Sequence, residues 1–254
     1  SFEHRIPLAL ALTGLAIDLP APLKKSAELA WPLRVESRLA AAVGAEPARD
    51  LLRVDLGSVV QAQYQRDLSR DAPQVLRGAL AVLDGLPPLP GGGVHAVLSW
   101  AAGGADAWQA VFGRWEAGPT GGSVAAPAGD DAYLPRTVAL RATALSSGGR
   151  RLTRLVAGVS QDSDGATWRG SLDADQLGGY VEYRAAQGTA NPGRVYARLA
   201  RLALPPSDAD SVENLLVQAP VSVPALDIVV DDFELRGKKF GRVEIEAANR
   251  AATG

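Results

Sequence analysis

The side chains of this chain that could do chemistry are mainly carboxylates, because its 254 residues include no cysteine and only two histidines. Four acids, Asp227, Asp231, Glu244 and Glu246, gather near the C-terminal end, and neighbouring carboxylates can act as a general acid and base. They alternate with apolar residues, however, which is the pattern of a strand with one solvated face. We therefore interpret them as surface charges and predict that the chain is not an enzyme.

The remaining chemical motifs are also weak. His95 stands at an odd position among even-numbered apolar neighbours, so its side chain is expected on the opposite, hydrated surface. The sequence contains no GxSxG nucleophile motif, and Lys238 and Lys239 follow a lone glycine rather than a phosphate-binding loop. We expect no cofactor.

The segment Asp162–Gly165 has the spacing that opens a calcium-binding loop, but the later acidic ligand of such a loop is absent. We interpret it as a four-residue hairpin loop that ends in a left-handed glycine, and we expect no metal. This loop predicts the cross-strand pairs Val159–Trp168, Ala157–Gly170 and Leu155–Leu172.

The composition is typical of a protein with many short strands. Hydrophobic residues make up 47% of the chain, enough for a core, while 27 glycines and 17 prolines supply turns. The net charge of −2 lacks the basic excess that nucleic-acid binding needs, so we expect no nucleic-acid partner. Because the chain has no methionine, we expect it to be processed or excised from a longer protein.

The N-terminal half is predicted to contain strand pairs. Apolar residues alternate with smaller ones over 8–12 and again over 15–19, and the run is interrupted well before the ~20 residues of a membrane helix. This alternation predicts two strands. Residues 52–56 and 60–64 form a second pair, in which one register keeps six apolar side chains on one face. That register pairs Leu56 with Val60, Val54 with Ala62 and Leu52 with Tyr64.

The clearest hairpin lies at the C-terminal end. Leu226, Ile228 and Val230 alternate with Asp227, Val229 and Asp231, and the doubled acid Asp231–Asp232 shifts the phase as a β-bulge does. A second strand covers 243–247. With the hairpin around Asp162–Gly165, it supplies an apolar surface that is the candidate site. Its residues are Leu155, Val159, Trp168, Leu172, Leu226, Ile228, Val230, Phe233, Leu235, Val243 and Ile245.

Two short helices are expected beside the strands. Trp108, Val111, Phe112 and Trp115 have the i, i+3, i+4, i+7 spacing of one helix face, and 173–177 are predicted to make one helical turn. Residues 117–133 are rich in Gly, Pro and Ala without periodicity, so we interpret them as a mobile loop. This loop divides the chain into a first groove segment, 1–116, and a second, 134–254.

Several stretches resemble the AsmA-like family of bacterial envelope proteins. The resemblance covers most of the chain and consists of strand-and-turn patterns rather than a catalytic motif. It implies a long, curved β-sheet groove that crosses the periplasm, is lined with apolar side chains and carries phospholipid toward the outer membrane. It also implies an inner-membrane anchor, which we expect outside this chain. The stretches are GLAIDLPAPLKK, WPLRVE, WRGSLDADQLGGYVEY, GRVYARLARLAL and VPALDIVVDDFELRGKKFGRVEIEAANR.

The predicted fold is mainly β, a long, twisted antiparallel sheet curled into an open groove, or half-pipe, with one or two short helices. About twelve strands spaced by ~4.8 Å would extend roughly 55 Å, and so long an open sheet must curl or be covered. A β-sandwich is the alternative, because alternation does not say whether the apolar face meets protein or lipid.

Three functions stay open on the sequence alone. We favour a periplasmic segment of a bridge-type lipid transport protein, whose partners would be phospholipid acyl chains and the rest of the same polypeptide at both ends. The second is a structural or protein-interaction β-domain of the cell envelope with no lipid conduit. The third is an enzyme with an unrecognised carboxylate site, which needs polar residues inside the groove, where the alternation puts almost none.

Overall fold

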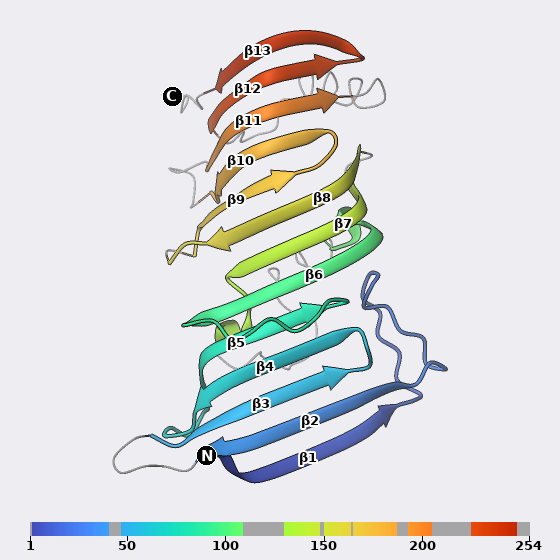
Figure 1. Ribbon diagram of the computed structural model, residues 1–254, viewed down its shortest axis with the longest axis vertical. Helices are drawn as coiled ribbons and strands as arrows, with labels where there is room; N and C mark the ends of the chain where they lie inside the picture. Colours follow the sequence, from blue (N-terminus) through green and yellow to red (C-terminus); the bar gives the residue numbers. More distant parts are fainter. Residues whose placement is uncertain are drawn as a thin grey trace, which may run out of the picture. The chain divides into compact units, whose positions relative to one another are not determined.

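The computed structural model describes residues 2–40, 47–108, 130–147, 150–163, 165–186, 193–204 and 225–247. In this part each strand is hydrogen-bonded to the next one along the chain (Figure 1). A short 3₁₀ helix, η1 (Asp130–Tyr133), lies between β6 and β7 in the sequence. The strands are β1 (Phe2–Leu12), β2 (Trp31–Ala40), β3 (Arg49–Leu56), β4 (Val60–Asp67), β5 (Gln74–Val82), β6 (Gly93–Gly104), β7 (Thr137–Ser147), β8 (Arg150–Gln161), β9 (Thr167–Asp173), β10 (Leu177–Arg184), β11 (Arg194–Leu204), β12 (Ala225–Leu235) and β13 (Lys238–Ala247).

The fold is mainly β, as predicted, and its thirteen described strands form one sheet that is not closed into a barrel. They do not divide into two separate sheets, as the sandwich alternative requires. Most neighbouring strands are antiparallel, but β5–β6 and β11–β12 are parallel. A parallel pair needs a long return connection, which the Pro- and Gly-rich residues 83–92 supply between β5 and β6.

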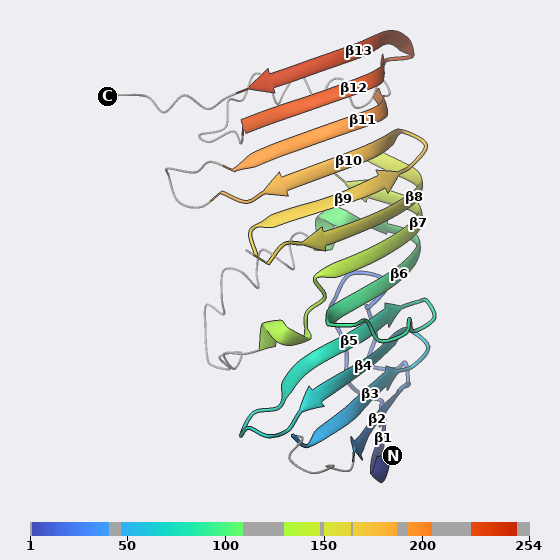
Figure 2. The ribbon, with the colours of Figure 1, turned by 60° about the vertical axis from the view of Figure 1, so that its left-hand side comes forward.

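The chain divides into two compact units, Ser1–Ala139 and Leu140–Gly254. The predicted boundary at 117–133 stays a prediction, because 109–129 lie outside the described residues. The end of that segment forms η1 where the sequence predicted a loop. Figure 2 shows η1, in yellow-green, beside β5. Tyr133 of η1 packs edge-on against Tyr64 of β4, with 5.2 Å between the ring centroids, and this contact explains the local order.

The β3–β4 hairpin organises the first unit, and its register is the predicted one. A tight turn at Gly57, with φ +57°, joins the two strands. Their apolar side chains share a face with Val94 of β6, and the residues buried there are Ala62, Tyr64 and Val94. The observed pairs are Leu56–Val60, Val54–Ala62 and Leu52–Tyr64.

The second N-terminal strand, predicted over 15–19, does not form. β1 covers the first run and pairs with β2, whereas Ile17 makes a single bridge to Lys25 within the β1–β2 connection. Gly14, with φ +83°, turns the chain away from the sheet, so the alternating residues after it have no neighbouring strand to pair with. The Lys25 Nζ atom is buried in this connection and donates a hydrogen bond to the Leu15 carbonyl at 2.6 Å.

The β8–β9 hairpin has the predicted faces, but the three predicted pairs are wrong by two residues. The loop lies one residue later than predicted, because the Asp162 N–H still donates across it to the Thr167 carbonyl at 2.8 Å. A shift of two residues leaves every side chain on its face. Trp168 and Val159 therefore share one surface without facing each other. The observed pairs are Gln161–Trp168, Val159–Gly170 and Ala157–Leu172.

The predicted helical turn at 173–177 is also wrong. β9 ends at Asp173 and β10 begins at Leu177, so three residues make a tight hairpin turn in which the Ala174 N–H donates to the Leu177 carbonyl at 2.8 Å. Of the predicted aromatic helix, residues 105–108 are helical. Val111, Phe112 and Trp115 lie outside the described residues.

Gly165 has a φ of +71°, as the predicted hairpin loop requires. A Cβ atom at this position would meet no atom within 4 Å, so a substitution tests backbone strain alone. The left-handed conformation costs an L-residue about 1–2 kcal/mol, so Gly165→Val is expected to lower the Tm by roughly 2–8 °C. Thermal unfolding followed by circular dichroism measures this shift.

Gly158→Val is the matched control, because Gly158 lies on β8 with equally open space and no positive φ. It should not lower the Tm. Calcium should leave the Tm of the wild-type chain unchanged, and a clear rise on adding calcium would favour the metal interpretation of this loop.

Candidate functional site

The predicted apolar residues come from β8, β9, β12 and β13, all within the second unit. β10 and β11 lie between the two hairpins in the sheet, so the six strands present one continuous surface (Figure 1). Strand pairing aligns their side chains in rows that run across the sheet. The central row consists of Val159, Gly170, Val181, Ala197, Ile228 and Ile245.

Two further rows flank the central one. Each is displaced by two residues along every strand and therefore lies on the same face. Five strand spacings of ~4.8 Å give each row a length of about 24 Å. One row is Ala157, Leu172, Gly179, Leu199, Val230 and Val243, and the other is Gln161, Trp168, Tyr183, Val195, Leu226 and Ala247. We call the surface formed by the three rows the apolar face.

The remaining predicted residues extend this surface. Phe233 pairs across the parallel ladder with Leu202, and Leu235 pairs with Leu204. Phe233 follows the predicted bulge, since the β12–β13 register shifts between Val230 and Phe233. Both Leu202 and Phe233 pack against the buried cluster of Ala197, Leu199 and Val230. Leu155, on β8 two residues before Ala157, is also buried.

Exposure on the apolar face rises from β12 to the edge strand β13. Val230 is 1% exposed, whereas Ile245 on β13 is 46% exposed. The main contacts of the described strands of this unit are with their neighbours in the sheet. The apolar face is therefore a sheet surface with side chains packed against one another but with accessible hydrocarbon at its edge, which is the kind of surface that binds a partner.

The opposite face of the same strands carries ion pairs. Asp227 contacts Arg198 at 2.8 Å and Arg194 at 3.0 Å, and Glu244 contacts Arg242 at 2.8 Å. The hydrogen bond from Arg198 lowers the pKa of Asp227, so this carboxylate stays ionised at neutral pH and is a poor general acid. The acids lie on the charged face, as predicted from their alternation.

The first unit has a polar cluster that sequence reasoning missed. Asp50 is 2% exposed and accepts hydrogen bonds from Ser37 Oγ at 2.8 Å and from Arg66 Nη2 at 2.5 Å. The Arg66 Nη1 atom also donates to the Tyr133 hydroxyl at 3.4 Å. The hydrogen bond to Asp50 raises the pKa of Arg66, so the cation is permanent. A signal was available, because Asp50 and Arg66 are in phase with the apolar residues of β3 and β4.

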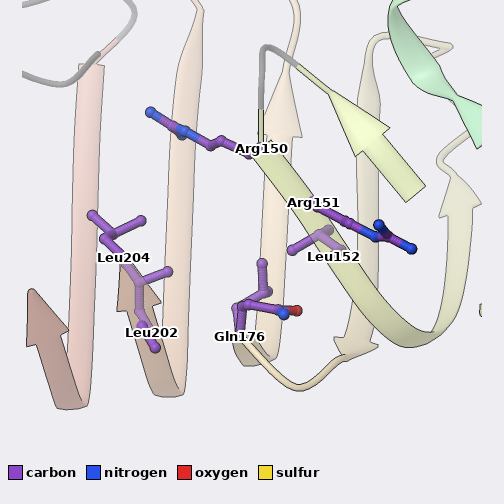
Figure 3. Close-up of a pocket in the computed structure, with 8 residues that line it drawn as sticks. Arg150, Arg151, Leu152, Gln176, Leu202 and Leu204 are labelled. Carbon is purple, nitrogen blue, oxygen red and sulfur yellow. The ribbon is translucent and has the colours of Figure 1, made fainter. Parts of the chain in front are cut away.

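A cavity of about 70 Å³ lies at one end of the apolar face. β8 and β11 both extend past the short β9–β10 turn, and Gln176 in that turn is hydrogen-bonded to both, through Thr153 and Ala203. Figure 3 shows leucine side chains around the cavity and Arg150 reaching across toward Leu204, whereas Arg151 points the other way. The lining residues are Arg150, Arg151, Leu152, Gln176, Leu177, Leu202, Ala203 and Leu204.

His95 is exposed between the buried Val94 and Ala96, as predicted. The described ranges contain no group of three or more His, Cys, Asp or Glu side chains arranged to hold a metal ion. No helix in the described part of the chain has the length and apolar character needed to span a membrane.

Comparison with known proteins identifies the family of this chain. A family model described as YhdP protein matches residues 2–253, which is almost the whole sequence. No curated protein and no solved structure gives a significant match. The family is not one of enzymes. The chain belongs to the YhdP family, a group of AsmA-like proteins of the Gram-negative cell envelope.

Proposed function

We propose that this chain is a periplasmic segment of a bridge-type lipid transport protein and that its apolar face holds phospholipid acyl chains. The observation that carries the proposal is the set of three aligned rows across β8–β13, apolar on one face and ion-paired on the other. The acyl chains of one leaflet fill about half of the ~30 Å hydrocarbon core of a bilayer. A row of about 24 Å is longer than that, so it can hold an acyl chain along its length. Membership of the YhdP family, one of bridge-like lipid transport proteins, supports the same conclusion.

The direction of the rows fits this function. They run across the strands, along the direction in which a sheet of this type grows by adding strands. A hydrocarbon chain lying along a row exchanges one set of apolar contacts for an equivalent set as it moves from strand to strand. The rest of the polypeptide at both ends would continue the path, and an inner-membrane anchor outside this segment would fix its start.

Lipid bound to the purified chain tests the proposal. The whole chain is expressed in the periplasm of a Gram-negative host, purified without detergent, and examined by native mass spectrometry and by solvent extraction. We expect copurifying phospholipid, released on denaturation. A chain that is folded but holds no lipid, and takes up none from vesicles, would favour the structural or protein-interaction β-domain instead.

A further inference from the structure

Arg150 stands beside hydrocarbon without an acidic partner. It begins β8 and lines the cavity at the end of the apolar face together with Leu152, Leu202 and Leu204. Within the described ranges no carboxylate lies within ion-pair distance of it. Two other arginines of the same unit differ in this respect, since Arg154 contacts Asp175 and Arg201 contacts Asp173. An unpaired guanidinium at the margin of an apolar surface is suited to an amphipathic anion.

We propose that Arg150 and this cavity form a headgroup site, in which the guanidinium binds the phosphate of a phospholipid whose acyl chains lie on the apolar face. This inference rests on the proposed function and names the end of the lipid that the protein recognises. The cavity, at about 70 Å³, is much smaller than the ~300 Å³ of a typical small-molecule pocket, so it takes the part of the lipid next to the phosphate.

The Arg150 guanidinium and the apolar face match the phosphate and the acyl chains of a phospholipid. A phosphate diester is a permanent anion that accepts two parallel hydrogen bonds from a guanidinium. Its acyl chains begin a few atoms away. Leu202 belongs both to the cavity and to the residues packed on the Ala197–Val230 cluster, so the hydrocarbon surface is continuous from Arg150 to the centre of the apolar face.

Binding by the whole, delipidated chain tests the site with three probes. These are phosphatidylglycerol, a diacylglycerol with the same acyl chains, and inorganic phosphate, each titrated against a fluorescent fatty-acyl reporter. Arg150→Gln is expected to weaken phosphatidylglycerol binding about tenfold, because it removes one charge-assisted interaction, and to leave diacylglycerol binding unchanged. Arg150→Lys should lose less. Inorganic phosphate at millimolar concentration should not displace the reporter.

Arg242→Gln is the matched control, because Arg242 lies on the charged face of β13, paired with Asp231 and Glu244, and does not line the cavity. It should bind both lipids as the wild type does. The headgroup site is wrong if Arg150→Gln weakens both lipids equally or neither, or if inorganic phosphate displaces the reporter as well as the phospholipid does. A wild-type chain that binds neither lipid would overturn the proposed function itself, and the headgroup site with it.

Discussion

Asp50→Ala is expected to lower the free energy of unfolding of the first unit by about 3 kcal/mol. The substitution removes the carboxylate that pairs with the permanently charged Arg66. Both side chains are buried or nearly so, with Asp50 2% exposed and Arg66 17% exposed. Removing one partner of a buried ion pair typically costs ~3–5 kcal/mol, because the remaining charge is neither hydrated nor paired. The lower end of that range applies here, since Arg66 keeps some access to water.

Urea denaturation followed by circular dichroism measures the loss for the whole chain. The double variant Asp50→Leu, Arg66→Met should recover most of it, because an apolar pair in phase with Leu52 and Tyr64 needs no counter-charge. The control is Asp55→Ala on the opposite face of β3, where the Arg53 side chain is 45% exposed and water can hydrate it, and it should cost less than about 1 kcal/mol. If Asp50→Ala is as mild as Asp55→Ala, the cluster does not hold the unit together.

The faces of the strands could be predicted from the sequence more securely than their pairing partners. Val159 and Trp168 stay on one surface in both the predicted and the observed pairing, because any even shift of register conserves the face. The pairing itself depends on where the loop closes, and one extra backbone hydrogen bond between Asp162 and Thr167 moves every partner by two residues. The β3–β4 register was predictable because the tight turn at Gly57 leaves no such freedom.

The features that depend on distant partners were not predictable. The apolar pattern after Gly14 is as regular as the one before it, yet it finds no neighbouring strand and forms a single bridge. The two hairpins form rows of six residues only because β10 and β11 lie between them. Gly170 on β9, Gly179 on β10 and Ala197 on β11 are small residues that give little periodic signal. Close approach explains these glycines, because a Cβ on Gly179 would lie 2.3 Å from the Arg198 carbonyl oxygen.

Ile245→Asp is expected to leave the chain folded and to lower its bound phospholipid several-fold, whereas Val230→Asp should abolish folding. The two positions lie on the same face of neighbouring strands but differ in exposure, at 46% for Ile245 and 1% for Val230. An unpaired carboxylate costs several kcal/mol in apolar surroundings unless water reaches it. At Ile245 water hydrates the carboxylate in the empty protein, so the new charge weakens lipid binding rather than folding. At Val230 the carboxylate is buried, so it lowers the free energy of unfolding by an amount that is large relative to the typical stability of a domain.

The measurements are the Tm of each variant and the phospholipid extracted per mole of folded protein. Glu244→Gln, on the charged face beside Ile245, is the control and should change neither quantity. In the full-length protein, Ile245→Asp should also impair the supply of phospholipid to the outer membrane. A chain that unfolds with Ile245→Asp would show that something in the protein covers this margin and leaves no room for lipid. A folded Ile245→Asp chain with unchanged lipid would place the acyl chains away from β13. Because exposure at the two positions differs so widely on one continuous face, the pair of variants separates a surface that binds hydrocarbon from a core that is merely apolar.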